Sequence, residues 1–423
     1  MVNPRWDRKH ENNKNQMTPM INPAPSRMTL FLSYGFRPFF LFAGIYAVSG
    51  MIAWMAWMGL QGDFAQSPPL ATDFPPFLWH AHEMLFGYTI AALAGFLLTA
   101  SPSWSGKPPV TGAPLALLAG IWLLGRLAVW FSAILPAAWV AVADLAFLPV
   151  LLAFLFRTLA SGNPRHYVFL GVPVILFAAN AMVHMERLGI TQDTAQAGHG
   201  LALDIFIVLI TVIGGRVVPA FTRNAIQKAN PGVEADPLPP RPWLDRLSIV
   251  SVLAVLAAGQ ITPGGTAIGW LALAAAVLNG LRLAGWKGRR VFDQPIAWVL
   301  HLGYAWLVAG LVARGLALTG GDLAETTALH VLTVGAIGTM TLAIMTRAAL
   351  GHTGRELKVP PAITFAYVLM SAATVLRVGG PLAAPDVQNI ALILAGAGWG
   401  LAFAVFSVVF WPILTGLPAD DRE

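Results

Sequence analysis

Long apolar segments are the feature that most constrains this chain. A helix that crosses the roughly 30 Å hydrocarbon core of a bilayer needs about 20 mostly apolar residues. Such runs follow one another along the 423 residues after a polar start. We expect spanning helices at 38–60, 80–101, 113–134, 137–156, 168–188, 199–220, 247–262, 266–284, 294–317, 325–347, 361–379 and 388–413. The sequence therefore predicts an all-α, polytopic membrane protein with about 12 transmembrane helices.

The low fraction of charged residues agrees with this fold class. Only 11% of the residues are charged and 57% are hydrophobic, whereas a soluble domain carries about 25% charged residues. Membrane lipid must therefore cover most of the surface. The chain has no cysteine, which excludes disulfides and thiolate metal sites. Any metal must be held by His, Met, Asp or Glu.

The basic residues predict how the chain crosses the membrane. If the N-terminus is cytoplasmic, every Lys and Arg except Arg126, Arg187, Arg314 and Arg377 falls on the cytoplasmic side. The positive-inside rule then places both termini in the cytoplasm and requires an even number of spans. The pI near 9.8 follows from this bias, so we expect no nucleic-acid partner.

The domain organisation is simple. Residues 1–27 are polar and rich in Asn and Pro, which predicts a disordered cytoplasmic tail. Residues 28–415 form a single transmembrane helical domain, and 416–423 form a second cytoplasmic tail. The one substantial polar connection, at 222–246, is too short for a folded soluble domain.

Histidines within the spans are the main candidates for chemistry. Intramembrane ionisable groups are costly and usually functional, and a neutral imidazole is the commonest metal ligand. His80 and His82 are two residues apart, so on a regular helix they point about 200° from each other and cannot share one metal. We expect them to serve different centres, with Glu83 on the same face as His80. The alternative is that His80 is an interfacial residue.

A weak repeat links three of these histidines. His82, His199 and His330 each open a span, and these spans lie four apart. The spacing suggests a pseudo-threefold arrangement of four-helix units, with the three imidazoles at one membrane face. Arg216 and Arg347 lie 17 residues after His199 and His330, respectively. His301 is expected deeper, about halfway along its span.

Buried charges allow two interpretations. Arg126 and Asp144 fall in spans joined by a tight turn, and pairing would neutralise both. A proton route from Asp or Glu to a metal centre is the functional alternative. Asp204 follows His199 by five residues, so we expect it to face elsewhere. His184, at a span end, is predicted to be interfacial or hydrogen-bonded rather than a ligand.

Several motifs resemble the NnrS family. They are Ser33-Tyr34-Gly35-Phe36-Arg37-Pro38-Phe39-Phe40-Leu41, Trp79-His80-Ala81-His82-Glu83-Met84-Leu85-Phe86-Gly87, His301-Leu302-Gly303-Tyr304-Ala305-Trp306, and His330-Val331-Leu332-Thr333-Val334-Gly335-Ala336-Ile337-Gly338 through Gly351-His352-Thr353-Gly354-Arg355. They extend from the first span to the loop after the tenth.

The resemblance implies a multi-pass protein of the bacterial inner membrane that contains haem b and copper. It implies a role in denitrification and in nitric oxide metabolism or relief of nitrosative stress. The histidines of the family motifs correspond to His80, His82, His301 and His330, and His199 is added from the repeat.

The expected arrangement also resembles the catalytic subunits of haem–copper oxidases and nitric oxide reductases, which is an analogy of fold. Those enzymes carry paired histidines on spans 7 and 10, and this chain has none on span 7 and only His330 on span 10. We expect His82 and His330 to ligate one haem, and His199 and His301, helped by His80, to form a second metal centre.

Four residues are expected to support these ligands without binding the metal, namely Glu83, Arg37, Arg216 and Arg347. Redox turnover in the manner of a nitric oxide reductase would need a quinol or another redox donor. The alternatives are a non-catalytic haem or copper carrier and a proton-coupled transporter.

Overall fold

The computed structural model describes residues 26–59, 71–160, 162–229, 238–262, 264–382 and 385–419, and in these ranges it contains helices and no strand. Twelve helical segments are long and apolar enough to cross a membrane. The predicted fold class is confirmed. Most of the predicted disordered tail, residues 1–25, lies outside the described residues.

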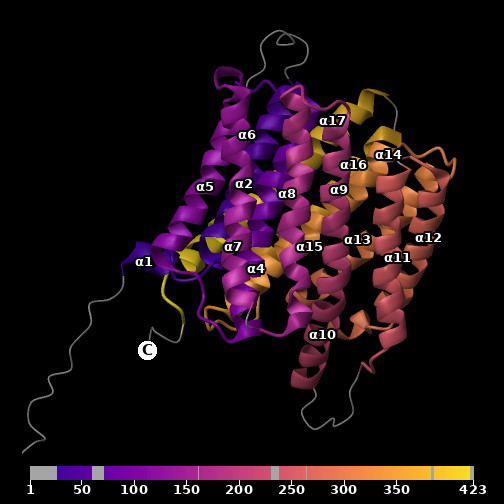
Figure 1. Cartoon of the computed structure of the whole chain (residues 1–423). Coiled ribbons are helices and arrows are strands. Elements are labelled where there is room, and N and C mark those ends of the chain that lie inside the picture. The colour runs from indigo at the N-terminus through magenta and orange to yellow at the C-terminus, as the bar shows by residue number, and fades with distance from the viewer. Residues whose placement is uncertain are drawn as a thin grey trace, which may run out of the picture.

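The spans follow one another through short connections (Figure 1). The α-helices are α1 (Arg27–Phe31), α2 (Phe36–Gly59), α3 (Pro76–His82), α4 (Ile90–Ser105), α5 (Gly112–Trp130), α6 (Ala137–Leu145), α7 (Phe147–Leu159), α8 (Val168–Arg187), α9 (Thr194–Leu209), α10 (Gly215–Ala229), α11 (Pro242–Ile261), α12 (Thr266–Ala284), α13 (Pro295–Leu318), α14 (Glu325–His330), α15 (Thr339–Gly351), α16 (Pro361–Gly379) and α17 (Pro385–Thr415). Short 3₁₀ turns are η2 (Ser132–Ile134), η3 (Pro164–His166), η5 (Gly288–Val291) and η7 (Gly380–Leu382).

Three spans contain a π-helical segment. These segments are η1 (Glu83–Thr89) between α3 and α4, η4 (Ile210–Gly214) between α9 and α10, and η6 (Val331–Gly338) between α14 and α15. They fall in spans 2, 6 and 10, the same three spans that the histidine repeat selects. The hydropathy pattern gave no sign of them, because a π-turn adds one residue to a turn without changing its apolar character.

Spans 2, 6 and 10 form the interior of the bundle, and their apolar windows are more buried than those of the other nine spans. Helices α5 and α6 lie at one edge of the molecule, and α11 and α12 lie at the opposite edge (Figure 1). The interior position explains why histidines, acids and threonines can stand in these spans. Their polar groups face protein and not lipid.

Spans 2 and 6 exceed their predicted lengths by the largest margins. Span 2 covers Pro76–Ser105, compared with 80–101 expected, and span 6 covers Thr194–Ala229, compared with 199–220. Hydropathy marks only the apolar part of a helix, whereas backbone hydrogen bonds continue through good helix formers such as Ala, Gln and Lys.

Arg37 joins the two ends of the domain. Its guanidinium donates to the carbonyl oxygens of Leu414 (3.1 Å) and Gly416 (2.8 Å). The start of the predicted second tail therefore packs against the domain, as the hydrogen bond from the Ala419 N–H to the Thr353 carbonyl also shows. α1 and the end of α17 lie at the same end of the molecule (Figure 1). This fits the predicted placement of both termini on one side, while the cytoplasmic orientation stays a prediction.

Candidate metal centre

His82 is the last residue of α3, where the backbone changes from α to π geometry, and its side chain is completely buried. Its Nδ1 lies 2.9 Å from Glu83 Oε1. Its Nε2 lies 2.9 Å from Asn180 Oδ1 and 3.1 Å from Asp144 Oδ2. Contact of one ring nitrogen with a carboxylate is the usual way to orient a metal-ligating histidine, since it leaves the other nitrogen for the metal.

Asp144 connects several of these groups. It lies in the last turn of α6, where Gly125 of α5 lets the two spans approach closely, since a Cβ on Gly125 would lie 3.1 Å from the Asp144 Cα. One carboxylate oxygen of Asp144 accepts a hydrogen bond from Arg126. The other accepts from His184 Nε2 (2.8 Å) and from the Asn180 side-chain amide (2.9 Å). Asp144 thus joins span 3 to span 5.

Arg126 supplies the positive charge of this group. It donates to Glu83 Oε1 at 2.5 Å as well as to Asp144, and all three side chains are buried. The Trp130 indole N–H lies within hydrogen-bonding distance of Glu83 Oε2 (3.1 Å) and of the Tyr46 hydroxyl (2.6 Å). The predicted pairing of Arg126 with Asp144 is confirmed. One guanidinium and two carboxylates leave a net charge of −1 if all are ionised.

We call the set His82, Glu83, Arg126, Asp144, Asn180 and His184 the His82 cluster. Ligand atoms of His82, Asp144 and His184 lie within 4.8 Å of one another. Tetrahedral bonds of about 2.0–2.1 Å place neighbouring ligand atoms about 3.4 Å apart. The observed separations of 3.1 Å and 2.8 Å need only a small expansion to admit an ion. The site fits a metal with nitrogen and oxygen ligands.

His199 lies beside this cluster. Its ring centroid is 6.1 Å from that of His82, and the ring is buried with no hydrogen-bond partner on either nitrogen. A buried imidazole without a partner is costly, which makes His199 a candidate ligand. Contact between His82 and the helix that carries His199 agrees with the sequence interpretation.

His80 points to a different part of the bundle. Its ring stacks on Trp54 of α2, with centroids 4.3 Å apart, and its Nδ1 is buried without a partner. His330 ends α14, and its Nδ1 donates to the Thr326 carbonyl at 2.6 Å, which leaves Nε2 as the free acceptor. The two histidines lie close enough to interact electrostatically. We call them the His80 pair.

The structure therefore separates His82 from His330. His82 lies with His184 and next to His199, whereas His330 lies near His80. The ligation of one haem by His82 and His330 stays a prediction. The expectation that His80 and His82 serve different regions matches their geometry.

His301 lies away from the His82 cluster. It is in the second turn of α13 and not halfway along the span, and its Nε2 is 2.8 Å from the Thr222 hydroxyl. Thr222 follows His199 by 23 residues in one continuous span, which corresponds to roughly 30 Å along the helix axis. The structure does not bring His301 and His199 together, and their shared centre stays a prediction.

Of the four residues expected to support the ligands, one lies in the His82 cluster and three lie elsewhere. Glu83 contacts His82 directly. Arg37 binds the end of α17, the Arg347 guanidinium lies 3.4 Å from the Phe221 ring centroid, and Arg216 is exposed. The contacts of Arg37 and Arg347 lie outside the His82 cluster.

Sequence reasoning missed His184 and Asn180 as members of the site. Both lie on α8 and four residues apart, so they share one face of that helix. This Asn-x-x-x-His spacing in an otherwise apolar span is the sequence pattern that indicates a shared polar site. Asp204 does face elsewhere, as predicted, and pairs with the buried Arg314.

The fold and the site together define a multi-pass helical membrane protein with a buried cluster of histidines, carboxylates and an arginine that fits a metal ion. The model of the family of NnrS proteins matches residues 30–417, and the chain belongs to this family. A comparison with curated proteins finds no match.

Proposed function

We propose that this protein acts in nitric oxide metabolism or in relief of nitrosative stress, and that it binds nitric oxide at a histidine-held metal inside the membrane. Membership of the NnrS family supports the biological setting. The His82 cluster is the observation that carries the chemistry, because it offers two imidazoles and a carboxylate within reach of one ion.

Copper is the ion that we propose for the His82 cluster. Imidazole suits copper, iron and zinc, and the family resemblance favours copper among them. The net charge of −1 from Glu83, Asp144 and Arg126 offsets part of the charge of a bound cation, which reduces the cost of burying it. Glu83 fixes the orientation of the His82 ring, and Arg126 holds both carboxylates in place.

Haem b is proposed at the His80 pair. The His82 ring contacts polar side chains through both nitrogens and packs against the rings of Phe74, Phe86 and His199, which favours the His80 pair over His82 as the haem ligands. His80 and His330 each retain a ring nitrogen without a protein partner. A haem bound there would supply one-electron redox chemistry.

Reductive turnover of nitric oxide also needs electrons and protons. A membrane quinol or another redox protein is the class of donor that we propose. The histidines and carboxylates of the His82 cluster, joined by hydrogen bonds, can hold protons next to the metal.

The test is metal analysis and visible spectroscopy of the protein purified in detergent. We expect copper and haem to co-purify, and nitric oxide to change the reduced-minus-oxidised spectrum. His184→Ala should lose copper and keep haem, whereas His330→Ala should lose haem and keep copper. His166→Ala is the control, since His166 stacks on Trp104 in a different part of the fold. A protein that contains neither metal contradicts the proposal.

A proton-coupled transporter is the second candidate function. Arg126 favours it, because a guanidinium among carboxylates and histidines is also typical of a proton-coupled ion-pair network. That function predicts a colourless protein that couples uptake to proton movement. A non-catalytic carrier predicts instead exchangeable haem or copper and no consumption of nitric oxide.

A further inference from the structure

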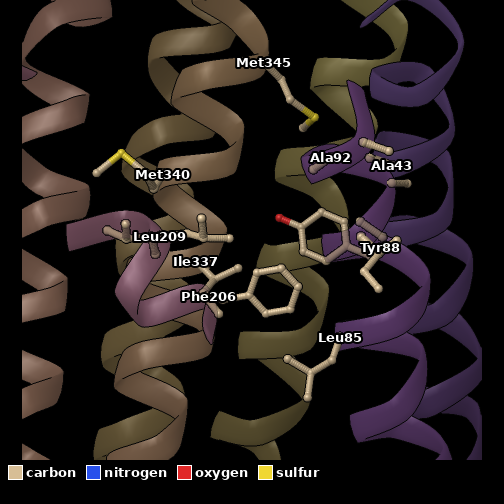
Figure 2. Packing of buried hydrophobic residues seen from close by; sticks show 14 of the residues in the cluster. Ala43, Leu85, Tyr88, Ala92, Phe206, Leu209, Ile337, Met340 and Met345 are labelled. Atoms are coloured by element: carbon tan, nitrogen blue, oxygen red, sulfur yellow. The ribbon is translucent and has the colours of Figure 1, made fainter. Parts of the chain in front are cut away.

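A partly open, apolar cavity of about 70 Å³ lies between spans 2, 6 and 10. Ala92 and Phe96 line it from α4, Phe206 and Leu209 from α9, and Met340 from α15. Figure 2 shows Phe206, Leu209, Ile337 and Met340 on one side of this interior and the Tyr88 ring on the other.

The three π-segments border the cavity. Thr89 ends η1, Gly214 ends η4 and Ile337 belongs to η6, and all three are lining residues. A π-turn widens a helix and displaces side chains from their regular positions, and such turns are frequent at functional sites. Three of them bordering one cavity indicate a built feature and not a packing defect.

The lining offers water no partners. Its only hydroxyl groups belong to Thr89 and Thr341, and both donate at 2.7 Å to backbone carbonyls, of Met84 and Ile337, respectively. Every other lining residue is apolar or glycine. A water molecule needs two to four polar partners to stay in a cavity, whereas apolar cavities stay dry and bind small apolar molecules.

We propose that this cavity is a binding site for a small apolar molecule, a class that includes diatomic gases. The volume exceeds the roughly 10–15 Å³ that a single water molecule needs by the same measure, and the apolar lining selects an uncharged, weakly hydrated occupant. The inference stands on the cavity itself and does not require a metal at the His82 cluster.

The position of the cavity relative to the three histidines indicates what such a binding site would do. His82 precedes Thr89, His199 precedes Phe206, and His330 precedes Ile337, each by seven residues. Seven residues are about two helical turns, or roughly 10 Å along the axis. The cavity thus lies about two turns below all three histidines, where it would concentrate a gas beside the candidate metal centre.

Xenon tests the proposal, because it is small, apolar and visible by anomalous scattering. Crystals of the full chain pressurised with xenon should show one xenon peak between Ala92, Phe206 and Met340. Ala92→Phe, which fills the cavity, should abolish this peak. Ala274→Phe places the same ring on an exposed position of α12 and should leave the peak unchanged.

A second variant covers the case in which Ala92→Phe does not fold. Ile344→Ala enlarges the cavity and should raise xenon occupancy. The proposal is overturned if the wild type binds no xenon there, or if the peak is insensitive to both variants. Continuous density that enters the cavity from the bilayer, as a lipid acyl chain would give, also overturns it.

Discussion

His80 and His82 stand two residues apart on α3, yet their surroundings differ in almost every respect. His82 is completely buried, and both of its ring nitrogens contact polar groups from other side chains. His80 is half-buried, stacks on Trp54 and keeps one buried nitrogen without a partner. Because the helix directs them about 200° apart, one helix contributes an imidazole to two chemically distinct regions.

This contrast shows that the bundle places two histidines of one helix in electrostatically different surroundings. The His82 cluster gathers its groups from spans 2 to 5 and contains two acids and an arginine. The His80 pair joins spans 2 and 10, beside Trp54 of span 1. We therefore expect substitutions in one region to leave the other largely unaffected, and three predictions test this independence.

The largest effect is expected for Asp144→Ala. The substitution leaves Arg126 with Glu83 alone and removes the acceptor of His184, and breaking a buried ion pair costs about 3–5 kcal/mol. The melting temperature in detergent should fall and copper should be lost. Asp322→Ala is the control, because Asp322 is exposed, and a surface substitution of this kind should change stability by no more than about 0.5 kcal/mol. Equal melting temperatures for the two variants would contradict the assigned role of Asp144.

Glu83→Gln should have a smaller effect that is specific to the metal. The amide keeps the shape of the side chain but accepts weakly from His82, and the loss of such an orienting partner lowers metal affinity by about 10–100-fold. Competition with a copper chelator measures this change. The haem spectrum serves as the internal control, since Glu83 does not contact the His80 pair. An altered haem spectrum with unchanged copper affinity would contradict the assignment of copper to the His82 cluster and haem to the His80 pair.

Trp54→Leu should act on the other region. It removes the ring that stacks on His80, and an aromatic pair contributes about 0.5–1.5 kcal/mol. We expect a shift or partial loss of the haem absorption with full retention of copper. Trp57→Leu is a suitable control, because Trp57 stacks on Trp54 and is not paired with His80. Loss of copper in Trp54→Leu would show that the two regions are coupled.

The smallest effect is expected from His352, at the end of the molecule opposite the histidine clusters. Its ring packs against Tyr34 and Phe36, and the partial burial that these rings provide lowers the pKa of His352 below its usual value. The unfolded chain then binds this proton more tightly than the folded protein does. Stability should therefore fall as the pH falls from about 6.5 toward the lowered pKa, and level off below it.

His352→Phe should reduce this dependence. The difference in melting temperature between about pH 7.5 and about pH 5.5 should be smaller in the variant than in the wild type. Other histidines also titrate in this range. The measurement therefore compares the pH-dependent change in melting temperature of the variant with that of the wild type. A larger pH dependence in His352→Phe would show that His352 gains stability from protonation.

The sequence by itself determined the membrane architecture. Apolar runs of about 20 residues cannot be covered by water, so the twelve spans follow from length and hydropathy alone. The directions of His80 and His82 also followed, since helical periodicity is a local property. The pairing of Arg126 with Asp144 could be predicted because a short turn joins their spans and buried charges require partners.

Only the tertiary structure decided which distant side chains meet. Nothing local indicates that His184 and Asn180 of α8 lie against His82, or that His301 lies by Thr222 instead of His199. Twelve spans of similar hydropathy can be packed in many ways, and the choice depends on close fits such as Gly125 against Asp144. The π-segments and the cavity between them arise from the same packing, because they depend on how neighbouring spans satisfy backbone groups and fill space.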